Sequence, residues 1–348
     1  MNETLNVAIV GYGYAAKTFH APLIAGVAGL ELAAIVSSDP DKVHADWPEV
    51  MVLATPTELF ARSDIDLVVI TTPNESHFPL ARMALAAGKH VVVDKPITVT
   101  VADARCLQAE AAAAVRLLSV FHNRRWDSDF LTLRQVIASG ELGRIVHFES
   151  HFDRYRPEVR ARWREQAVTG SGLWYDLGAH LLDQMLQLFG APESISLELA
   201  QQRDGAEADD WFHAVLRYGQ SRCILHGSAL VPVPAPRFTV HGSLGSFIKQ
   251  GLDPQEDGLK AGARPPAPDW GVDPLTATLS VWRDGVCQTR ELACIAGNYP
   301  TYYSAVRDAI RGLGPNPVTT EEAIRVIGLI ELGLQSAQQG RMMQTSFD

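Results

Sequence analysis

The 348-residue sequence is poor in cysteine, with four at Cys106, Cys223, Cys287 and Cys294. None of these forms a Cys-x-x-Cys pair or a cysteine–histidine cluster with the spacing of a zinc site. The pattern argues against a disulfide framework and is typical of reduced thiols in a cytoplasmic protein. We expect no bound metal, and we expect isolated histidines such as His151, His213 and His226 to be satisfied strand residues.

Positive charge and long apolar runs are also scarce. Lysine and arginine total 30 against 40 acidic residues, which gives a net charge of -10 and disfavours a nucleic-acid partner. No stretch of 18 apolar residues occurs, and the first ten residues lack the basic and apolar regions of a signal peptide. The sequence therefore predicts a soluble cytoplasmic protein with no membrane association.

A glycine-rich turn near the amino terminus, within the stretch LNVAIVGYGYAAKTFH, is the most informative feature. The apolar run Val7–Val10 has the length of a buried strand, and the sequence becomes helical after the turn. Gly11 permits a sharp turn, and Gly13 has no Cβ to keep a phosphate from the backbone. A small Ala16 allows close packing of helix on strand. The pattern indicates a dinucleotide-binding turn, although Gly-x-Gly can also mark only a tight turn.

Short apolar strands alternate with alanine-rich helices through the first third of the chain. The expected strands after the first are 30–36, 67–70, 90–93 and 117–121, with helices such as 80–87 and 101–115 between them. Continuous apolar strands joined by helices predict a doubly wound parallel sheet, an α/β Rossmann domain over residues 1–122.

A different rhythm follows Trp126. A helix is expected over 130–138, then strands near 145–152, 193–199, 212–218, 222–229 and 238–241, with one helix over 173–189. This order predicts an α+β domain over 123–348 with a largely antiparallel sheet and two closing helices, 302–311 and 321–336. The proline-rich stretch 253–274 is expected to be a surface or partly disordered loop. One open sheet face would need a cover, so we expect a homo-oligomer, a dimer or tetramer.

Two polar sequences follow strands of the predicted parallel sheet, at the edge where such sheets bind ligands. Thr71-Thr72-Pro73-Asn74 follows one strand, and Asp94-Lys95-Pro96 follows another. Partial desolvation at the sheet edge would suit the Lys95 ammonium to proton donation or to hydrogen bonding with a reacting oxygen. A surface lysine at a strand end is the alternative.

In the second domain, polar residues form a stripe on an otherwise apolar helix: Asp176, His180, Asp183 and Gln187. The stripe faces either solvent or a cavity. Four residues before His180, the Asp176 carboxylate could orient the imidazole as a general base.

The order of GYGYAAK, TTPNESH, DKP and Asp176-x-x-x-His180 over nearly the whole chain resembles the Gfo/Idh/MocA oxidoreductases. Within that family, LSVFHNRRWDSDFLTL, HFDRYRPEVRARWRE, WYDLGAHLLDQMLQLFG and GLDPQED are most similar to the NADP-type scyllo-inositol dehydrogenase branch. The resemblance implies that Lys95, Asp176 and His180 are catalytic. Asp94 stands where the family has glutamate. The aspartate side chain is shorter, so the interaction partner of the Asp94 carboxylate stays open.

The resemblance also implies two sets of binding residues. Those expected to contact the cofactor are Gly11, Gly13, Tyr14, Ala15, Ser37, Ser38, Lys42, Thr72, Pro73, Asn74, His77 and Lys95. Those expected to contact a polyol ring are Asn123, Arg124, Tyr155, Arg156, His180, Asn298, Tyr299 and Tyr302. Packing and ion pairing are the alternative roles of the second set, and a solvated or intersubunit face is the alternative for the arginine run 154–164.

The end of the second strand bears on the choice of cofactor. NAD enzymes of this fold usually place a carboxylate there, for the ribose 2′-hydroxyl. Here the strand ends in Ser37-Ser38, which can donate to a 2′-phosphate, and Lys42 lies one helical turn further on. NADP is therefore favoured over NAD, while Asp39 and Asp41 keep NAD open.

Together these features predict an enzyme that transfers hydride between a secondary alcohol of a polyol or sugar and a nicotinamide. His180 would take the hydroxyl proton, and Lys95 would hydrogen-bond the same oxygen. Two other functions remain open, a non-catalytic NAD(P)-binding regulator of the same fold and a redox-assisted glycoside hydrolase.

Overall fold

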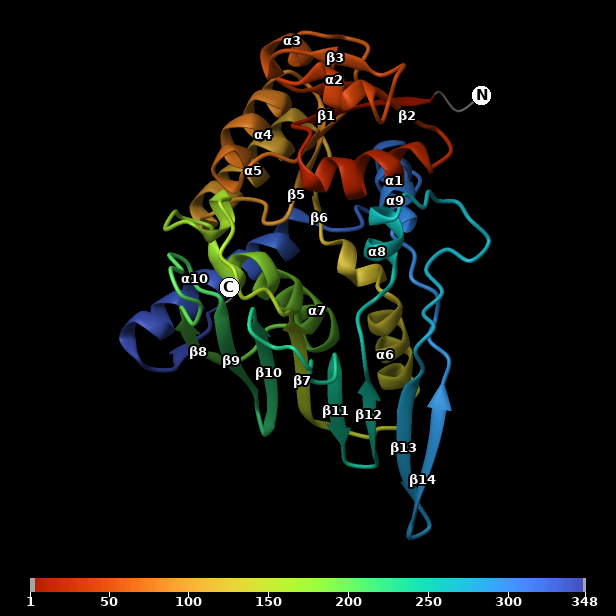
Figure 1. The fold of residues 1–348 in the computed structure, drawn as a ribbon, viewed down its shortest axis with the longest axis vertical. Helices are drawn as coiled ribbons and strands as arrows, with labels where there is room; N and C mark the ends of the chain where they lie inside the picture. The colour runs from red at the N-terminus through yellow and green to blue at the C-terminus, as the bar shows by residue number, and fades with distance from the viewer. Residues whose placement is uncertain (1–3, 347–348) are drawn as a thin grey trace. The chain divides into compact units, whose positions relative to one another are not determined.

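The computed structural model describes residues 4–346. The chain forms two compact units, and neither is one continuous segment (Figure 1). The first unit runs to residue 123 and also includes 255–270 and 298–324, whereas the second comprises 124–254, 271–297 and the chain from 325 onward.

Six parallel strands form the sheet of the first unit, in the order β3-β2-β1-β4-β5-β6. They are β1 (Leu5–Val10), β2 (Leu30–Val36), β3 (Met51–Leu53), β4 (Leu67–Ile70), β5 (His90–Asp94) and β6 (Leu118–Phe121). Every residue of β4 is fully buried, because helices cover both faces of the sheet. The predicted doubly wound α/β fold is confirmed.

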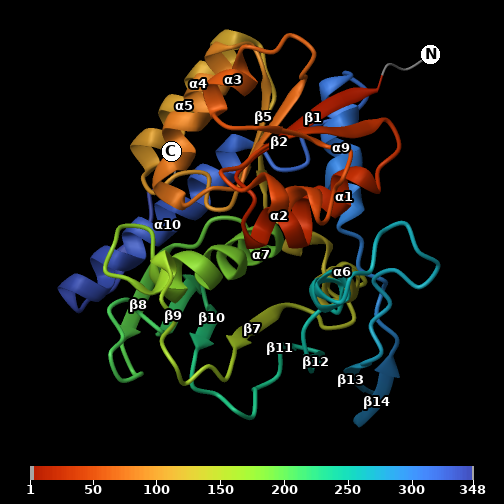
Figure 2. The same cartoon turned by 45° about the horizontal axis from the view of Figure 1, so that its top comes forward.

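Helices of the first unit lie on the two faces of this sheet: α4 and α5 on one, α1 and α9 on the other (Figure 2). The set is α1 (Ala21–Ala25), α2 (Pro40–His44), α3 (Pro56–Phe60), α4 (His77–Ala86), α5 (Val101–Ala114), α8 (Gln255–Lys260) and α9 (Pro300–Ile310). A π-helical turn, Ala16–His20, leads from the glycine turn into α1. The expectation of an irregular loop over 253–274 is wrong for α8, where Gln255 and Leu259 are buried.

Nine strands form the sheet of the second unit, in the order β14-β13-β12-β11-β7-β10-β9-β8-β15. They are β7 (Ile145–Asp153), β8 (Ser194–Ala200), β9 (Trp211–Tyr218), β10 (Ser221–Ser228), β11 (Phe238–Gly242), β12 (Gly245–Lys249), β13 (Ala277–Arg283), β14 (Val286–Leu292) and β15 (Met343–Gln344). Among these strands the β7–β10 pair is parallel and the others are antiparallel, which confirms the predicted α+β domain. The strands β12 to β15 were not predicted from the sequence.

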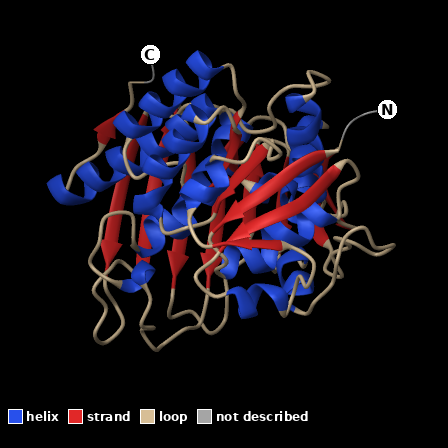
Figure 3. Cartoon of the chain, turned by 90° about the horizontal axis from the view of Figure 1, so that it is seen from above, coloured by secondary structure: helices blue, strands red, loops and turns tan. Residues whose placement is uncertain are grey.

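One face of this second sheet is apolar and the other is polar. Phe148 and Phe152 of β7 are fully buried, whereas the alternate residues His147, Glu149 and His151 are only partly buried. Helices α6 (Ser128–Ala138) and α7 (Ala179–Phe189) belong to this unit, and α10 (Thr320–Gln339) continues into it. Figure 3 shows the chain from above, with helices in blue and strands in red. In the described part of the chain no helix is both long and apolar enough to cross a membrane.

The helix expected over 173–189 begins with a π-helical turn, Trp174–Gly178, before α7. Trp174 is fully buried, and its indole Nε1 donates to the Ile330 carbonyl at 3.2 Å. A Cβ built on Gly178 would stand 2.4 Å from Cε3 of this indole. Glycine is therefore required at position 178 by packing against the indole ring.

We expect Gly178→Ala to lower the free energy of unfolding by about 1–3 kcal/mol, because the indole must move in a filled core. Urea denaturation of both proteins measures the difference. Gly258→Ala, in helix α8, is the matched control. The nearest atom to its added Cβ is the Cβ of Ala263, at 3.8 Å. Equal losses in the two variants would contradict the packing explanation.

Candidate functional site

The glycine turn after β1 adopts the geometry that a dinucleotide-binding turn needs. Gly11 has a φ of +92°, which disfavours other residues, and its N–H donates to the Val36 carbonyl at 3.0 Å. Gly13 differs, because its added Cβ would meet nothing within 4 Å. Packing within the protein therefore does not demand glycine at 13, and the space in front of it is open to a ligand.

A pocket opens at the carboxyl ends of β1, β2 and β4. Six of the residues predicted to bind the cofactor line it together, namely Gly11, Ser37, Ser38, Lys42, Thr72 and Pro73. Tyr12, Asp39 and Ser76 also line it and were not among the predicted residues. The strand-to-turn pattern could have indicated Tyr12, which lies inside the glycine turn.

Lys42 and Asp39 have different positions in this pocket. The Lys42 ammonium donates to the Tyr12 carbonyl at 3.1 Å, which holds it beside the glycine turn. The Asp39 carboxylate caps helix α2 by accepting from the Lys42 N–H at 3.0 Å. One oxygen of the nearest acid is thus occupied by the helix terminus.

The other predicted cofactor residues vary in exposure. Tyr14 is 51% exposed and donates its hydroxyl hydrogen to Glu256 at 2.7 Å. Burial and this carboxylate raise the pKa of Tyr14 to about 12. Ala15 directly precedes the π-helical turn, and Asn74 is buried at the start of the short 3₁₀ helix Asn74–Ser76.

His77 connects the two loops that follow β4 and β5. Its Nδ1 lies 2.8 Å from the Pro96 carbonyl oxygen and its Nε2 lies 2.9 Å from the Thr72 carbonyl oxygen. The ring is almost fully buried. It spaces the Thr72 loop from the loop that carries Lys95.

Asp94 has partners that the sequence did not reveal. Its Oδ1 accepts from the Lys95 N–H at 2.8 Å and lies 3.9 Å from His20 Nε2. The other nitrogen of His20 is 2.5 Å from the Tyr303 hydroxyl. Burial raises the pKa of Asp94, but His20 and the Lys95 charge outweigh burial, and the pKa lies below its usual range. Lys95 itself is buried.

Three predicted substrate residues lie at or near α9. Asn298 is exposed, whereas Tyr299 and Tyr302 are fully buried. The Tyr302 hydroxyl donates to Ser119 Oγ at 2.9 Å, and its ring packs edge-on against Phe121 at 5.0 Å between centroids. These contacts agree with the packing alternative for Tyr302, and a substrate role for the three residues stays a prediction.

In the second unit, the arginine run surrounds Asp176. The Arg164 Nε lies 3.7 Å from Asp176 Oδ1, and both line a pocket with Arg154, Arg156 and Arg162. His180 is buried four residues further on, in α7. Asp183 does not line this pocket and forms a bidentate ion pair with Arg125 at 2.6 and 2.9 Å. Tyr155 is 59% exposed at an isolated bridge with Leu230.

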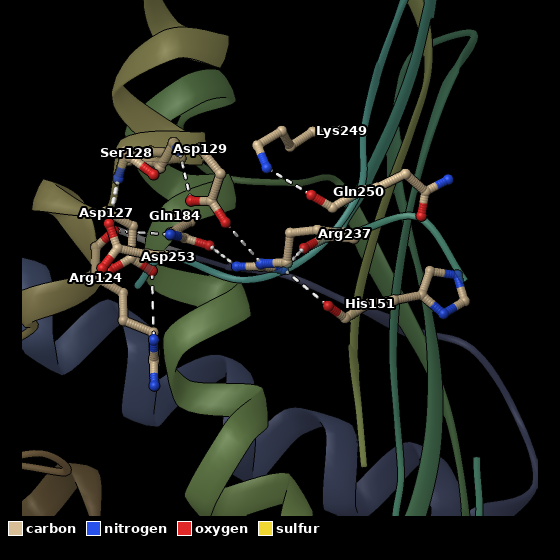
Figure 4. A network of polar contacts seen from close by, with 12 residues as sticks. Arg124, Asp127, Ser128, Asp129, His151, Gln184, Arg237, Lys249, Gln250 and Asp253 are labelled. Carbon is tan, nitrogen blue, oxygen red and sulfur yellow. Dashed lines mark hydrogen bonds and ion pairs between the residues drawn. The ribbon is translucent and has the colours of Figure 1, made fainter. Parts of the chain in front are cut away.

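Arg124 and Asn123, two further predicted substrate residues, are buried in the 3₁₀ helix Asn123–Trp126. The Arg124 guanidinium lies 3.4 Å from Asp127 and 4.7 Å from the Phe152 ring centroid. Its carbonyl accepts from Gln184, whose amide oxygen accepts from Arg237 at 2.6 Å (Figure 4). Arg124 is thus part of a buried polar network, and its substrate contact stays a prediction.

The residues of the first unit fit a dinucleotide. The open space at Gly13, the hydroxyls at the end of β2 and the Lys42 ammonium offer backbone, neutral and cationic groups to phosphates. No group in this set requires a different ligand to explain it.

Two family models match the chain. One, described as the NAD-binding Rossmann fold of an oxidoreductase family, Gfo/Idh/MocA, matches residues 5–122. The other, described as the C-terminal alpha/beta domain of that family, matches residues 134–345.

Individual proteins are similar over nearly the full length. The oxidoreductase YdgJ of Escherichia coli is 57% identical over 338 residues, which are 97% of this chain and 98% of that protein. The scyllo-inositol 2-dehydrogenase (NADP(+)) IolW of Bacillus subtilis is 40% identical, over 97% of this chain and 95% of that protein. The structure of the YPO2259 oxidoreductase from Yersinia pestis aligns with a TM-score of 0.97 and 56% identity, over 100% of this chain and 99% of that one.

We expect Asp94→Asn to reduce stability at neutral pH by about 1–3 kcal/mol, because the buried carboxylate loses its charge-assisted contacts. The folded-state pKa is depressed, so this contribution is complete above the unfolded pKa of about 3.9 and disappears as the pH falls through the folded value. Urea unfolding across this range measures it. The exposed Asp41→Asn is the control, and a difference that persists unchanged into acid would contradict the assignment.

Proposed function

Because this chain belongs to the Gfo/Idh/MocA family of oxidoreductases, we propose that it is an NADP-dependent dehydrogenase of a polyol or sugar. It would move a hydride between a secondary alcohol and the nicotinamide. The observation that carries the cofactor assignment is the pocket in which Ser37, Ser38 and Lys42 meet the glycine turn.

The charge around this pocket supports NADP. A 2′-phosphate carries negative charge, which a free carboxylate at the end of β2 would repel. Ser37 and Ser38 present hydroxyls at that place, and Lys42 contributes a cation. Asp39 is nearby, but its carboxylate caps α2. NAD is the alternative cofactor.

The substrate class rests on the relatives. IolW bears the name of an NADP-dependent scyllo-inositol dehydrogenase and is 40% identical to this chain. Vicinal hydroxyls of an inositol or sugar would suit the arginine and tyrosine donors predicted for substrate contact. A regulator without turnover or a redox-assisted glycoside hydrolase remains the alternative function.

The proposed chemistry assigns one role each to Asp176, His180 and Lys95. Asp176 would orient His180, which takes the hydroxyl proton as the carbonyl forms. The Lys95 ammonium would donate a hydrogen bond to the same oxygen and stabilise its negative charge. When bound, the nicotinamide supplies the hydride acceptor. Asp94 would position Lys95 through the backbone N–H contact at 2.8 Å.

The function is tested by the initial rate of NADP reduction with scyllo-inositol at mildly alkaline pH, with NAD in parallel. We expect a faster rate with NADP and one NADPH per product. A regulator or a redox-assisted hydrolase would consume no net cofactor. Inactivity with both cofactors, in a protein that binds NADPH, would reject scyllo-inositol as the substrate, and a faster rate with NAD would reject the cofactor assignment.

A pair of variants isolates the phosphate contact in the same assay. Lys42→Ala should weaken NADPH binding roughly tenfold and leave NADH binding almost unchanged, because only NADPH offers a 2′-phosphate. Lys17→Ala removes an equal charge nearby, but that ammonium pairs with Asp46 at 2.8 Å. Similar losses in both variants would point to general electrostatics instead.

Replacement of Lys95 tests the catalytic assignment separately. Lys95→Met keeps much of the side-chain volume and should lower kcat by roughly a hundredfold or more, with NADPH affinity changed far less, because the lost contact stabilises developing charge. Steady-state kinetics and fluorescence titration of NADPH measure the two effects. Near-normal turnover would remove Lys95 from the mechanism.

A further inference from the structure

Three histidines lie side by side on adjacent strands, on the polar face of the second sheet. In the parallel β7–β10 pair, His151 is the register partner of His226, and in the antiparallel β10–β9 pair His226 is the partner of His213. Asp153 and Glu149 flank His151 on β7 and share its face, because side chains alternate along a strand. In Figure 4 the His151 ring points away from the buried Arg237 network.

The polar atoms of this group are close together. His151 Nε2 lies 2.7 Å from Glu149 Oε1, and His151 Nδ1 lies 3.1 Å from Asp153 Oδ2. His226 Nε2 lies 3.6 Å from Asp153 Oδ1. One ligand atom each from His151, Asp153 and His226 can be chosen within 4.8 Å of one another.

The polar atoms of this group cannot all be satisfied without an additional cation. A neutral imidazole has one N–H, yet both nitrogens of His151 face carboxylates, which only accept. If Nε2–H donates to Glu149, the lone pair of Nδ1 faces Asp153. A proton or a metal ion must therefore lie between Nδ1 and Asp153 to avoid repulsion between two acceptors.

Asp153 gives a second, independent observation. Its side chain is only 2% exposed, and its Oδ1 has no hydrogen-bond partner among the described residues. The 3.6 Å separation from His226 Nε2 is too long for a hydrogen bond. A buried carboxylate oxygen and an imidazole nitrogen held just beyond contact leave room for an ion that binds both.

We propose that His151 Nδ1, the Asp153 carboxylate and His226 Nε2 bind a divalent transition-metal ion of the zinc class. Glu149 does not bind the ion. It accepts the hydrogen bond of the His151 Nε2–H and so fixes that tautomer of the imidazole. This carboxylate–histidine–metal arrangement is common in metal sites. Two histidines and one carboxylate are borderline-soft ligands that suit zinc better than calcium or magnesium.

The charges of the site agree with this assignment. Glu149 and Asp153 bring two negative charges, which a divalent ion balances. Burial lowers the pKa of His226, because desolvation disfavours the charged imidazolium. Burial also lowers the pKa of His151, but its hydrogen bonds to Asp153 and Glu149 outweigh burial and raise it. A metal ion and protons compete for the same imidazole nitrogens, so binding should weaken as the pH falls.

Groups on neighbouring strands complete the surroundings. His147 on β7 lies 3.2 Å from the other oxygen of Glu149, and Trp211 and His213 on β9 pack against the His226 ring at 5.5 and 5.7 Å between centroids. His147 and His213 are further imidazoles close to the proposed ligands. The pH dependence of binding is therefore to be compared between variants and not assigned from one curve.

The test is a Zn²⁺ titration of the full-length, untagged protein after treatment with a chelator, by calorimetry and by competition with a chromogenic chelator. We expect one tight site per chain, with affinity that falls as the medium is acidified. His226→Gln and Asp153→Asn should each weaken Zn²⁺ binding by roughly tenfold or more, and Glu149→Gln should have a smaller effect. Thermal melting without metal establishes that each variant is folded.

His241→Gln is the matched control, because this histidine lies on β11 and bonds to Ser246 at 2.7 Å. It should leave the affinity for Zn²⁺ unchanged. The proposal is overturned if the folded His226 and Asp153 variants bind Zn²⁺ as the wild type does, if the control loses as much affinity, or if acidification leaves binding unaltered. In those cases a proton alone joins His151 to Asp153.

Discussion

Parallel pairing of the six strands of the first sheet is the constraint on which the candidate cofactor site depends. Because all six run in one direction, their carboxyl ends lie at one edge, and residues from distant parts of the chain meet there. Gly11 follows β1, Ser37 follows β2, Thr72 follows β4 and Lys95 follows β5. The glycine turn alone could serve packing. Because the turn shares one pocket with the serine hydroxyls and the Lys42 ammonium, this edge is a candidate site for a phosphate group.

The second unit depends on a different interaction, the burial of one guanidinium. Arg237 is almost fully buried and contacts Asp129 of α6 at 3.4 Å, Gln184 of α7 at 2.6 Å and Ser150 of β7 at 2.5 Å (Figure 4). Desolvation of such a charge is costly, so its partners are held in fixed positions. The Arg237 side chain thus links α6 and α7 to β7. The predicted substrate residue Arg124 belongs to it through its carbonyl.

Much of the fold was predictable because its signals are local. Continuous apolar strands such as β4 and the glycine turn identified the α/β unit, and the helices of the second unit were found to within a few residues. The strand β14 was missed because six of its seven residues are exposed, so no apolar alternation marks it. The alternating run ATLSV of β13 was a signal that could have been used. Contacts between distant segments gave no signal at all. The sequence shows neither the His20 partner of Asp94 nor the pairing of His151 with His226, which depends on the parallel register of β7 and β10.

His77 has a mechanical consequence for the first unit. One rigid ring spans the carbonyl of Thr72 and that of Pro96, and it is buried, so no water can substitute when either oxygen moves. The two loops are therefore linked to each other through the imidazole. A ligand that displaced the Thr72 loop would therefore also shift the loop that carries Lys95.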